Sequence, residues 1–422
     1  MELRLTREDQ ASLSGTRGEA NRLAMRIVVG VAAAMGADHL IDISGAHIDS
    51  CLHHGRSGLD FVERLTDGGG RVAVPTTLNV SSLDLLHPDL YRGDEEFGRE
   101  ARELMQRYED LGCRPTWTCA PYQLPDRPAF GDHVAWAESN AIVFANSVLG
   151  ARTHRWGDFM DISAAITGRV PAAGLHLDAA RRGEVLLRVE RVTDRLLGLD
   201  VLYPVLGHLV GKRAGSRVPV VEGLPPRVSE DRLKALGAAA AASGAVGLVH
   251  VVGSTPEAPT TEAALGDRPP AETIVVGPAA LTAARDDLST GSGVELGAVS
   301  VGTPHYSVAE IGRVVELIAG RRVAAGVGFY LSTGRHILTE ARLRGWEGAL
   351  TDAGVTIVTD TCTYVTPVMD EVRGVAMTDS AKWAYYAPGN LGLDVVFGSV
   401  EDCVESAIEG RVVRDESMWA GD

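Results

Sequence analysis

Six polar segments of the chain carry side chains that could bind a ligand or take part in a reaction. They fall at residues 42–47, 116–122, 138–153, 302–307, 360–363 and 378–386, beside apolar runs that predict strands and helices. Proteins built from alternating strands and helices place their sites at such element ends. None of the six is a zinc signature, a phosphate-binding loop or a nucleophile elbow. They therefore indicate an α/β enzyme whose site is assembled from dispersed segments.

Two cysteines are candidates for binding a metal. Cys119 precedes Pro121, and the stiff turn that proline imposes can direct the sulfur at a metal or cluster. A buried cysteine that only packs is the alternative for Cys119. Cys362 lies in the segment DTCT, at the C-terminal end of a predicted strand.

The segments at 42–47 and 138–153 hold hydrogen-bonding side chains suited to a small polar ligand. Ser44, Gly45 and His47 follow a predicted strand, where glycine lets the backbone approach a ligand; a turn with local hydrogen bonds is the alternative. In WAESNAIVFANSVLGARTHR, Asn and Ser side chains sit inside an apolar run, so they need buried partners or a ligand. The candidates in this run are Glu138, Ser139, Asn140, Asn146 and Arg152.

The segments at 302–307 and 378–386 are suited to binding an anionic group. Thr303, His305 and Ser307 stand just before a helix with a Ser-x-x-Glu capping box, and free N–H groups at a helix start attract an anion, a cluster or a carboxylate. Lys382 is one of only three lysines and lies among hydroxyl groups that include Ser380. A lysine so placed is suited to an acidic substrate, and a solvated surface loop is the alternative.

The elements that position these segments alternate between short apolar runs and amphipathic helices. Helices are predicted over the first 35 residues and at 94–112, 229–244 and 307–320, and strands near 39–44, 71–78, 273–277, 354–360 and 393–398. Such alternation predicts an α/β fold with largely parallel sheets. Pro- and Gly-rich stretches at 214–227 and 253–270 suggest three lobes, at residues 1–215, 216–285 and 286–422.

Composition narrows the class of protein. The 422 residues carry a net charge of −16, which disfavours a nucleic-acid partner. No apolar run approaches the roughly 18–20 residues of a membrane span, and the charged start MELRLTREDQ lacks the apolar core of a signal peptide. Five cysteines, odd in number and without a CxxC pair, point to a reducing compartment. We expect a cytoplasmic protein with no membrane or nucleic-acid partner.

At these segments the chain resembles the aconitase X family, a divergent branch of the aconitase superfamily. The matching stretches are DISGAHID, TCAPYQ, WAESNAIVFANSVLGARTHR, ITGRVPAAGLH, HVVGSTPEAPTTEAAL, GTPHYSVAEI, DTCTY and TDSAKWAYYAPG, from residue 42 to 389. The resemblance implies an aconitase-like, multi-lobed α/β core and an iron–sulfur hydro-lyase. Members of the family dehydrate cis-3-hydroxy-L-proline in bacteria and mevalonate 5-phosphate in archaea.

The resemblance also implies a cofactor. Cys119 in TCAPY and Cys362 in DTC match two ligand positions of the family's cluster, whereas the third, the cysteine of a GCPH motif, is Thr303 in this chain. Threonine is a poor iron ligand, so we expect a [2Fe-2S] cluster or a mononuclear iron. In that chemistry iron acts as a Lewis acid on the leaving hydroxyl, while a base removes the proton alpha to the carboxylate.

The resemblance implies a partner as well. In the superfamily a small swivelling domain closes over the cluster, and after LDVVFGSVEDCVESAIEG this chain has no room for it. We therefore expect the large subunit of a heterodimer whose second chain is a small swivel-domain subunit.

The expected reaction is dehydration of a small hydroxy acid, with cis-3-hydroxy-L-proline to 1-pyrroline-2-carboxylate as the best candidate. Two alternatives stay open: a cluster-poor relative that dehydrates or isomerises another hydroxy acid in a biosynthetic pathway, or a phosphorylated one such as mevalonate 5-phosphate; and a non-catalytic scaffold for the small subunit. The expected catalytic residues are Lys382, Ser380, Glu138 and His305. The expected substrate-binding residues are Ser44, Gly45, His47, Ser139, Asn140, Asn146, Arg152 and Ser307.

Overall fold

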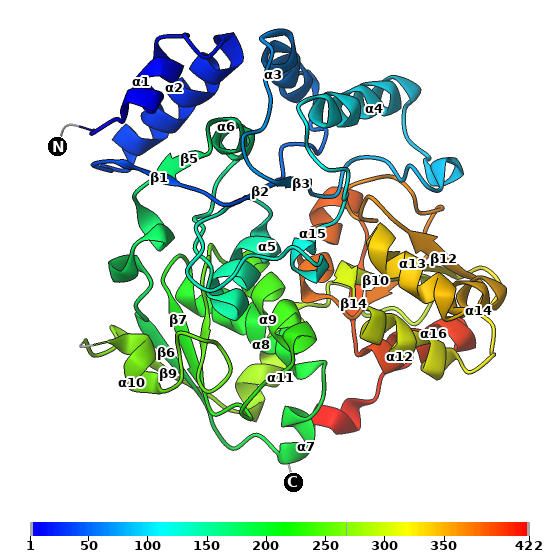
Figure 1. Cartoon of the computed structure of the whole chain (residues 1–422). Helices are drawn as coiled ribbons and strands as arrows, with labels where there is room; N and C mark the ends of the chain where they lie inside the picture. The colour runs from blue at the N-terminus through cyan, green and yellow to red at the C-terminus, as the bar shows by residue number, and fades with distance from the viewer. Residues whose placement is uncertain (1–2, 267, 420–422) are drawn as a thin grey trace. The chain divides into compact units, whose positions relative to one another are not determined.

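The chain divides into two compact units in the computed structural model, which describes residues 3–266 and 268–419 (Figure 1). Unit 1 comprises Met1–Leu83 and Gly93–Arg182. Unit 2 comprises Asp84–Arg92 and Gly183–Asp422. The chain therefore leaves unit 1 at Asp84, contributes the short segment Asp84–Arg92 to unit 2, and returns to unit 1 at Gly93.

Unit 1 is built on short strands. Its strands are β1 (Leu40–Asp42), β2 (Ala46–Ile48), β3 (Thr76–Leu78), β4 (Ala135–Trp136) and β5 (Arg169–Pro171). Strands β2, β3 and β4 form a parallel sheet in the order β3-β2-β4, while β1 and β5 pair antiparallel. Its helices are α1 (Arg7–Leu13), α2 (Glu19–Ala34), α3 (Arg56–Asp67), α4 (Glu95–Asp110), α5 (Ser139–Phe144) and α6 (Met160–Thr167), with one π-helical turn, η3 (Ala145–Leu149).

Local chemistry accounts for the helices of unit 1. Asp94 caps α4 by accepting from the N–H groups of Glu96 and Phe97, and the buried side chains of α4 recur at helical spacing against α3. The helix predicted over the first 35 residues is two helices, because Gly15 and Gly18 adopt positive φ angles of 82° and 99° between α1 and α2.

Unit 2 contains two parallel sheets. One has the order β8-β7-β6-β9 and the other the order β12-β11-β10-β13-β14. Their strands are β6 (Val185–Val189), β7 (Pro219–Glu222), β8 (His250–Val251), β9 (Glu272–Val276), β10 (Leu296–Tyr306), β11 (Gly328–Thr333), β12 (Val355–Val358), β13 (Val375–Thr378) and β14 (Val395–Phe397). The helices are α7 (Asp194–Leu197), α8 (Leu202–Ala214), α9 (Glu230–Ser243), α10 (Thr261–Leu265), α11 (Pro278–Asp287), α12 (Val308–Ile318), α13 (Arg335–Leu343), α14 (Trp346–Ala353), α15 (Ala381–Leu391) and α16 (Val400–Glu409).

Helices α8 and α9 pack closely because small residues line their contact. A Cβ atom added at Gly207 would lie 2.2 Å from the carbonyl oxygen of Leu236. The run Ala238–Ala242 of α9 is buried throughout, so α9 is a core helix. Helix α15 contacts α8 and α9 as well as β10, β13 and β14, and it thereby links the two sheets of unit 2.

The observed elements match much of the sequence pattern. The fold is α/β with largely parallel sheets, as expected, and the predicted helices at 94–112, 229–244 and 307–320 are α4, α9 and α12. The lobe boundary expected after residue 215 falls inside one sheet, because β6 precedes it and its neighbour β7 follows it. The division between the units lies instead at Arg182–Gly183, since the Pro- and Gly-rich stretch at 214–227 contains β7 rather than a linker.

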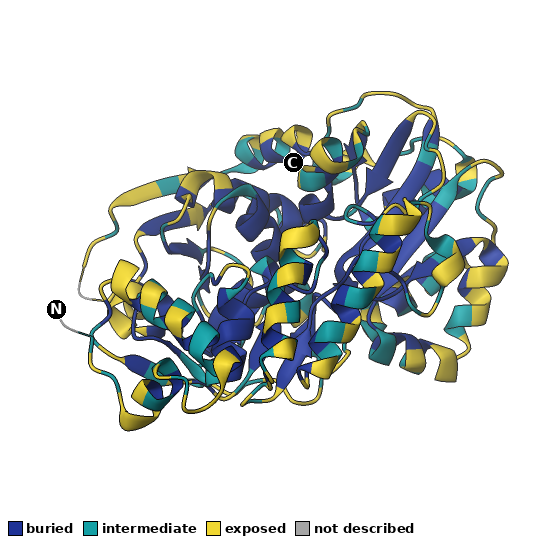
Figure 2. Ribbon diagram, turned by 90° about the horizontal axis from the view of Figure 1, so that it is seen from above, coloured by how far each residue is buried: buried dark blue, intermediate teal, exposed yellow. Residues whose placement is uncertain are grey.

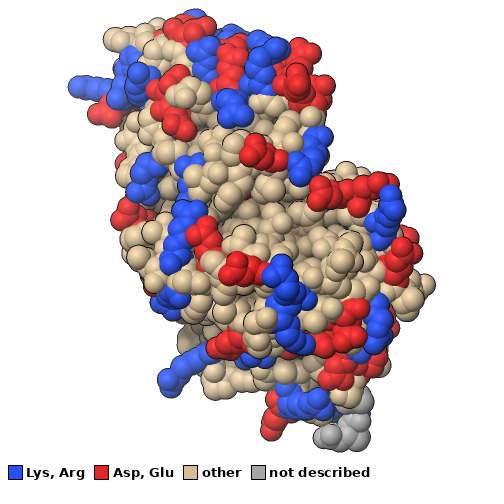
Figure 3. Space-filling model, turned by 90° about the vertical axis from the view of Figure 1, so that its right-hand side faces the viewer, with Lys and Arg blue, Asp and Glu red and all other residues tan. Residues whose placement is uncertain are grey.

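Burial follows the sheets. Figure 2 shows strands that are largely dark blue and helices striped with buried and exposed residues, as expected for helices that cover a sheet with one face. On the face drawn in Figure 3, basic and acidic side chains are interspersed rather than gathered by sign. Within residues 3–266 and 268–419, no helix is both long and apolar enough to cross a bilayer.

Candidate functional site

The carboxyl ends of the parallel strands in unit 1 carry a row of polar side chains. Ile48 of β2 pairs with Leu78 of β3, so the next residues, Asp49 and Asn79, stand opposite each other beyond the strand ends. Glu138 follows β4 at the same edge of the sheet. Side chains two residues apart on a strand share a face, which places His47 on the same face as Asp49.

Two polar pairs bridge β2 and β3 on this face. The Nδ1 atom of His47 lies 2.8 Å from the hydroxyl of Thr77, and the Nδ2 amide of Asn79 donates to Asp49 Oδ1. His47 is fully buried and Asn79 is 2% exposed. Within residues 3–266 and 268–419, His47 Nε2 and Asn79 Oδ1 are buried without a hydrogen-bond partner. A row of buried side chains that includes polar atoms without hydrogen-bond partners is suited to binding a polar ligand.

Asp161, in the first turn of α6, fixes the backbone beside this row. Its Oδ2 atom accepts from the N–H groups of Asp49 and Ser50 at 2.8 and 2.9 Å, and its Oδ1 atom accepts from the Ser50 hydroxyl at 2.9 Å. Burial, together with the charges of Glu138, Asp158 and Asp161, raises the pKa of Asp49 to about 7. Burial lowers the pKa of His47 to about 3, so its imidazole is neutral.

Glu138, Asn140 and Cys119 form one hydrogen-bonded chain in unit 1. Glu138 caps α5 by accepting from the N–H of Ala141 at 2.7 Å, and it also accepts from Asn140 Nδ2 and the Ser139 hydroxyl. Asn140 Nδ2 donates to the Cys119 carbonyl at 2.8 Å, while its Oδ1 accepts from Tyr122 at 2.6 Å. Cys119 is 2% exposed. The structure therefore brings Glu138, Ser139, Asn140 and Cys119 together.

Asn146 and Arg152 have partners within unit 1. Asn146, in η3, donates to the Thr153 carbonyl and accepts from the Thr153 N–H and from Arg181. Arg152 donates to the His176 carbonyl at 3.0 Å and pairs with exposed Asp178. These contacts satisfy the buried polar groups that the sequence singled out.

Ser44 and Gly45 lie at the other end of β2. They line a cavity of about 290 Å³ with residues that precede β3 and β4, among them Pro75 and Val134. Thr77, the partner of His47, also lines this cavity, whereas Asp49 and Asn79 lie beyond the carboxyl ends of β2 and β3. Ser44 and Gly45 thus precede β2, and Asp49 follows it.

In unit 2, His305 and Cys362 form a pair of potential metal ligands. A ring nitrogen of His305 and the Sγ atom of Cys362 lie within 4.8 Å of each other, and the two residues are 0% and 1% exposed. The Nε2 atom of His305 lies 3.2 Å from the Thr361 carbonyl, and burial lowers the pKa of His305 to about 4. A neutral imidazole beside a thiol is a donor set that iron accepts. Oxygen ligands alone suit magnesium or calcium instead.

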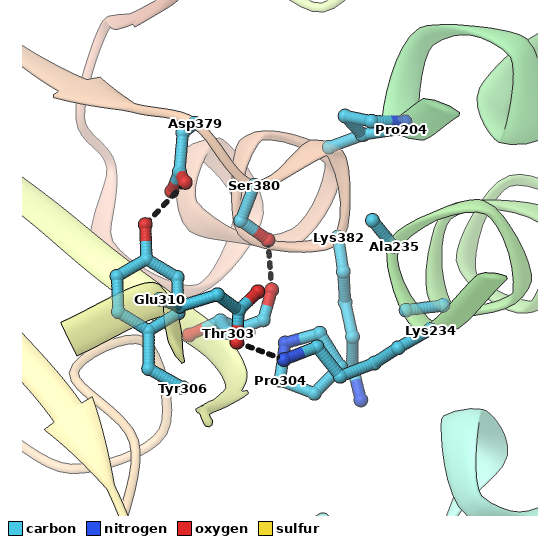
Figure 4. Close-up of a pocket in the computed structure, with 12 residues that line it drawn as sticks. Pro204, Lys234, Ala235, Thr303, Pro304, Tyr306, Glu310, Asp379, Ser380 and Lys382 are labelled. Atoms are coloured by element: carbon cyan, nitrogen blue, oxygen red, sulfur yellow. Dashed lines mark hydrogen bonds and ion pairs between the residues drawn. The ribbon is translucent and has the colours of Figure 1, made fainter. Parts of the chain in front are cut away.

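A small cavity in unit 2 gathers Thr303, Ser380 and Lys382. Its volume is about 40 Å³, room for about one water molecule. Figure 4 shows Ser380 and Lys382 entering it from the start of α15, with the Ser380 hydroxyl donating to the Thr303 carbonyl. Ser380 also caps α15 by accepting from the Trp383 N–H. Within the described part of the chain, the buried Thr303 hydroxyl has no hydrogen-bond partner.

A buried ion pair forms one wall of that cavity. The Lys234 ammonium of α9 pairs with Glu310, lies 3.2 Å from Asp231 and donates to the His305 carbonyl at 3.4 Å (Figure 4). Burial by itself would lower the pKa of Lys234, but the carboxylates of Glu310 and Asp231 raise it. Glu310 also accepts from the Ser307 N–H in the capping box of α12, and Ser307 donates to Asp231. Lys234 therefore anchors the backbone of His305 and the start of α12.

Sequence reasoning missed Asp49, Asn79 and Lys234. Asp49 stands inside the stretch DISGAHID, so its position was visible, but its pKa is raised by burial and then by carboxylates that follow it by 89 to 112 residues. Asn79 lies just after the run RVAVPTTL, a strand-end position that marks a candidate. Lys234 sits within an ordinary amphipathic helix pattern, and only its tertiary partners set it apart.

Three family models match the chain in order. The first domain of aconitase X matches residues 2–179, the second domain residues 183–286 and the third domain residues 296–409. The first model ends and the second begins close to the division between units 1 and 2.

Curated relatives carry two names. The cis-3-hydroxy-L-proline dehydratase of Pseudomonas aeruginosa is 43% identical over 419 residues, which are 99% of this chain and 72% of that protein. The phosphomevalonate dehydratase large subunit of Methanosarcina mazei is 37% identical over 410 residues, 96% of this chain and 98% of that protein. The named relatives are thus dehydratases, that is, hydro-lyases.

A solved structure agrees in fold. The aconitase X of Thermococcus kodakaraensis, in its holo form, matches with a TM-score of 0.86 and 33% sequence identity, over 96% of this chain and all of that one. Matched family models over nearly the whole chain, relatives above 40% identity and a shared fold give one conclusion: the chain belongs to the aconitase X family.

Proposed function

We propose that this protein is a hydro-lyase that removes water from cis-3-hydroxy-L-proline and yields 1-pyrroline-2-carboxylate. The observation that carries the proposal is the 43% identity, over 99% of the chain, to a protein of that name. A second protein of the same name, from Hypocrea jecorina, is 41% identical over 97% of the chain. The phosphomevalonate dehydratase large subunits are 32–37% identical, which makes mevalonate 5-phosphate the second candidate substrate.

The proposed cofactor is iron, as a [2Fe-2S] cluster or a mononuclear ion. The buried pair of His305 and Cys362 supports a metal site in unit 2, and the family resemblance adds Cys119 as a thiolate ligand. When bound, iron with an open coordination position supplies a Lewis acid that favours loss of hydroxide. Thr303 replaces a family cysteine, which favours the smaller cluster or the single ion.

We propose that Lys382 and Arg152 bind the substrate carboxylate. Each is a cation that can donate charge-assisted hydrogen bonds to a carboxylate. Lys382 is 4% exposed, and Arg152 forms an ion pair with an exposed aspartate, Asp178. Ser380, Ser139 and Asn140 are the proposed polar neighbours, with Ser44, Gly45, His47, Asn146 and Ser307 kept as further candidates.

The proposed partner is a small subunit. The chain covers 98% of the Methanosarcina large subunit, a name that implies a second chain in that enzyme. We propose a companion of the swivel-domain type here as well, with the heterodimer in the cytoplasm. A chain that only scaffolds such a companion is the remaining alternative.

One assay separates these candidates. The chain, co-expressed with a companion encoded beside it and reconstituted anaerobically with iron and sulfide, is given cis-3-hydroxy-L-proline or mevalonate 5-phosphate. We expect release of 1-pyrroline-2-carboxylate from the first substrate and no dehydration of the second. The reverse preference would transfer the assignment to mevalonate 5-phosphate. Iron binding without turnover of either would favour another hydroxy acid, and absence of both would favour the scaffold.

A further inference from the structure

The segment of unit 2 that carries Cys362 turns sharply just before that residue. The N–H of Thr361 donates to the Thr359 carbonyl at 2.6 Å, and Asp360 between them has a φ of 61°. A hydrogen bond that closes on the residue two positions back, around a positive φ, makes the rarer and more strained kind of γ-turn. A residue other than glycine persists in this left-handed region where its surroundings hold it there. The turn therefore has to be stabilised by contacts outside its own backbone.

The Asp360 side chain makes such contacts. Its carboxylate is fully buried and accepts two hydrogen bonds from the Arg335 guanidinium, at 2.5 and 2.7 Å, in the paired geometry that arginine makes with a carboxylate. The carboxylate also accepts from the N–H of Leu85 at 3.0 Å. Asp84 holds the preceding residue by accepting from the N–H and the hydroxyl of Thr359. The turn is thus fixed at its first and at its central residue.

Two groups of the proposed metal site follow this turn directly. The Thr361 carbonyl lies 3.2 Å from Nε2 of His305, and because a carbonyl oxygen can only accept, Nε2 carries the hydrogen. A neutral imidazole has one N–H, so the lone pair that can bind a metal stands on Nδ1. Cys362 is the next residue, and its Sγ atom lies within 4.8 Å of a ring nitrogen of His305. A backbone carbonyl on the second nitrogen is a common way to orient a histidine that binds a metal.

The other polar side chains of this segment are used within the protein. The hydroxyls of Thr361 and Thr366 lie 2.6 Å apart. The Thr363 hydroxyl accepts from Trp383 Nε1 at 2.8 Å and lies 2.7 Å from the Ser300 hydroxyl. All three threonines are at most 1% exposed. The segment is therefore a buried frame that fixes the directions of its cysteine and its carbonyl groups.

We infer that Asp360, held by Arg335, is a positioning residue of the metal site. Its γ-turn aims the Thr361 carbonyl at His305 and sets the place of Cys362. This inference rests on the proposed function, because it takes those last two residues as metal ligands. Asp360 acts through the backbone and makes or breaks no bond in the reaction. Its loss should therefore change how tightly a metal is bound in the absence of any substrate.

The alternative role for Arg335 is a direct contact with the substrate carboxylate. Such a contact would affect KM but not metal binding without substrate, so the tests measure metal binding alone. The probe is Co²⁺, which accepts thiolate and imidazole ligands. A cobalt–thiolate bond also gives a near-ultraviolet absorption band that reports whether a cysteine reaches the metal.

The first test titrates the metal-free full chain with Co²⁺ under anaerobic conditions. Arg335→Gln keeps a polar side chain but loses the paired contact, and we expect the Co²⁺ affinity to fall about 10- to 100-fold, the usual effect of losing an outer partner of a metal ligand. Arg342→Gln is the matched control. Arg342 lies on the same helix, α13, and pairs with Glu347 while 47% of its side chain is exposed. This variant should bind Co²⁺ as the unsubstituted protein does.

The second test separates the turn from the ion pair by two substitutions at one position. Asp360→Asn and Asp360→Val both remove the charge, but asparagine adopts a positive φ readily and a β-branched residue does not. We expect Asp360→Asn to bind Co²⁺ more tightly than Asp360→Val and to keep the cobalt–thiolate band.

The third test needs no variant that folds. In the unsubstituted, metal-free protein labelled with ¹⁵N at histidine, the NMR signals of His305 should show the hydrogen on Nε2. A side chain that served only the stability of the fold would leave this tautomer unchanged, whereas we expect Arg335→Gln to add the form with the hydrogen on Nδ1.

Three results would overturn the inference. One is an Arg335→Gln variant whose Co²⁺ affinity stays within threefold of the unsubstituted protein. Another is an Asp360→Val variant that binds Co²⁺ as tightly as Asp360→Asn. The last, which needs no variant, is a His305 hydrogen on Nδ1 in the unsubstituted protein. All three leave the dehydratase assignment intact, whereas an unsubstituted chain that binds neither Co²⁺ nor iron would refute the metal centre of the proposed function itself.

Discussion

At the scale of single residues, the site depends on side chains whose chemistry is set by burial. Cys119, His305 and Cys362 are each at most 2% exposed, so their donor atoms are shielded from bulk water. Thiolates hold iron far better than hydroxyl oxygens of the same size. Substitution of these proposed ligands therefore has a direct readout, the visible absorption of the protein.

We predict that Cys119→Ser and Cys362→Ser each lower the bound iron at least about tenfold and abolish the visible absorption band. Serine offers a hard hydroxyl where a soft thiolate is needed. The control is Cys403→Ala, since Cys403 is equally buried but lies in α16 and is not among the proposed ligands. Iron content measured after anaerobic reconstitution checks the prediction. Full iron retention in either serine variant would remove that cysteine from the ligand set.

A second prediction at this scale concerns Thr303, which is 4% exposed and precedes His305 by two residues. Thr303→Cys restores the family's GCPH sequence and supplies a further thiolate. We expect more iron per chain than in the unsubstituted protein, measured by metal analysis together with acid-labile sulfide. Three or four irons per chain already present in the Thr303 protein would contradict the smaller metal centre.

The sequence could identify these residues by type but not by environment. His305 and Cys362 were visible in motifs, whereas the pairing of Arg152 with Asp178 joins residues 26 positions apart. The pKa of Asp49, about 7, is raised first by burial and then by the charges of Glu138, Asp158 and Asp161, which only the fold brings near it. Motif spacing does not report desolvation, which is the largest cause of that shift.

At the scale of elements, α9 links the two sheets of unit 2 through one buried lysine. The Lys234 side chain is 2% exposed and holds Glu310 of the α12 capping box, the nearby Asp231 and the His305 carbonyl. A buried ion pair adds little net stability, but removing one partner leaves an unpaired charge inside the protein. The position of α12 and of His305 therefore depends on this contact.

We predict that Lys234→Met lowers the free energy of unfolding by about 3–5 kcal/mol. Lys212→Met is the matched control: Lys212 pairs with Asp287 but is 48% exposed, so its loss should cost less than about 1 kcal/mol. Adding Glu310→Gln to Lys234→Met should recover part of the loss, because the stranded carboxylate is then gone. Chemical denaturation of the four proteins measures these differences. Equal costs for the two lysine variants would contradict the buried role of Lys234.

Local spacing predicted the elements that local contacts create. The capping box of Ser307 and Glu310 was readable in four letters, and the structure confirms it. Sheet membership was not readable in the same way, because two helices, α7 and α8, separate β6 from β7 along the chain. The Pro- and Gly-rich stretch at 214–227 has the composition of a linker. In the fold it contains β7, an interior strand of the sheet with the order β8-β7-β6-β9.

At the scale of the whole molecule, one short excursion carries the chain between the units. Asp84, in this segment of unit 2, is 3% exposed and accepts from the N–H and the hydroxyl of Thr359 at 2.8 and 2.9 Å. Burial by itself would raise the pKa of Asp84, but His87 and Thr359 outweigh it and lower that pKa. Asp84 in turn raises the pKa of His87. Asp84 thus fastens the segment to Thr359 of unit 2, while the pair that responds to pH, Asp84 with His87, lies within the segment.

We predict that His87→Asn destabilises the protein more at pH 5.5 than at pH 9. The raised pKa of His87 gives stability that is fully present below the unfolded value of 6.5 and is lost as the pH rises through the folded value. The lowered pKa of Asp84 gives stability that is present above 3.8 and is lost as the pH falls through its folded value. Because the His87 side chain is 31% exposed, we expect about 0.5–1 kcal/mol at pH 5.5. Melting temperatures that differ by the same amount at both pH values would contradict the pairing.

The measurement that tests the account most directly is turnover by the complete enzyme. The chain with its companion, reconstituted with iron and sulfide under anaerobic conditions, is incubated with cis-3-hydroxy-L-proline, and the formation of 1-pyrroline-2-carboxylate is followed. We predict that product appears, that Cys362→Ser abolishes product formation, and that the same variant loses the iron absorption. Product formation at an unchanged rate by a colourless, iron-free protein would contradict the account.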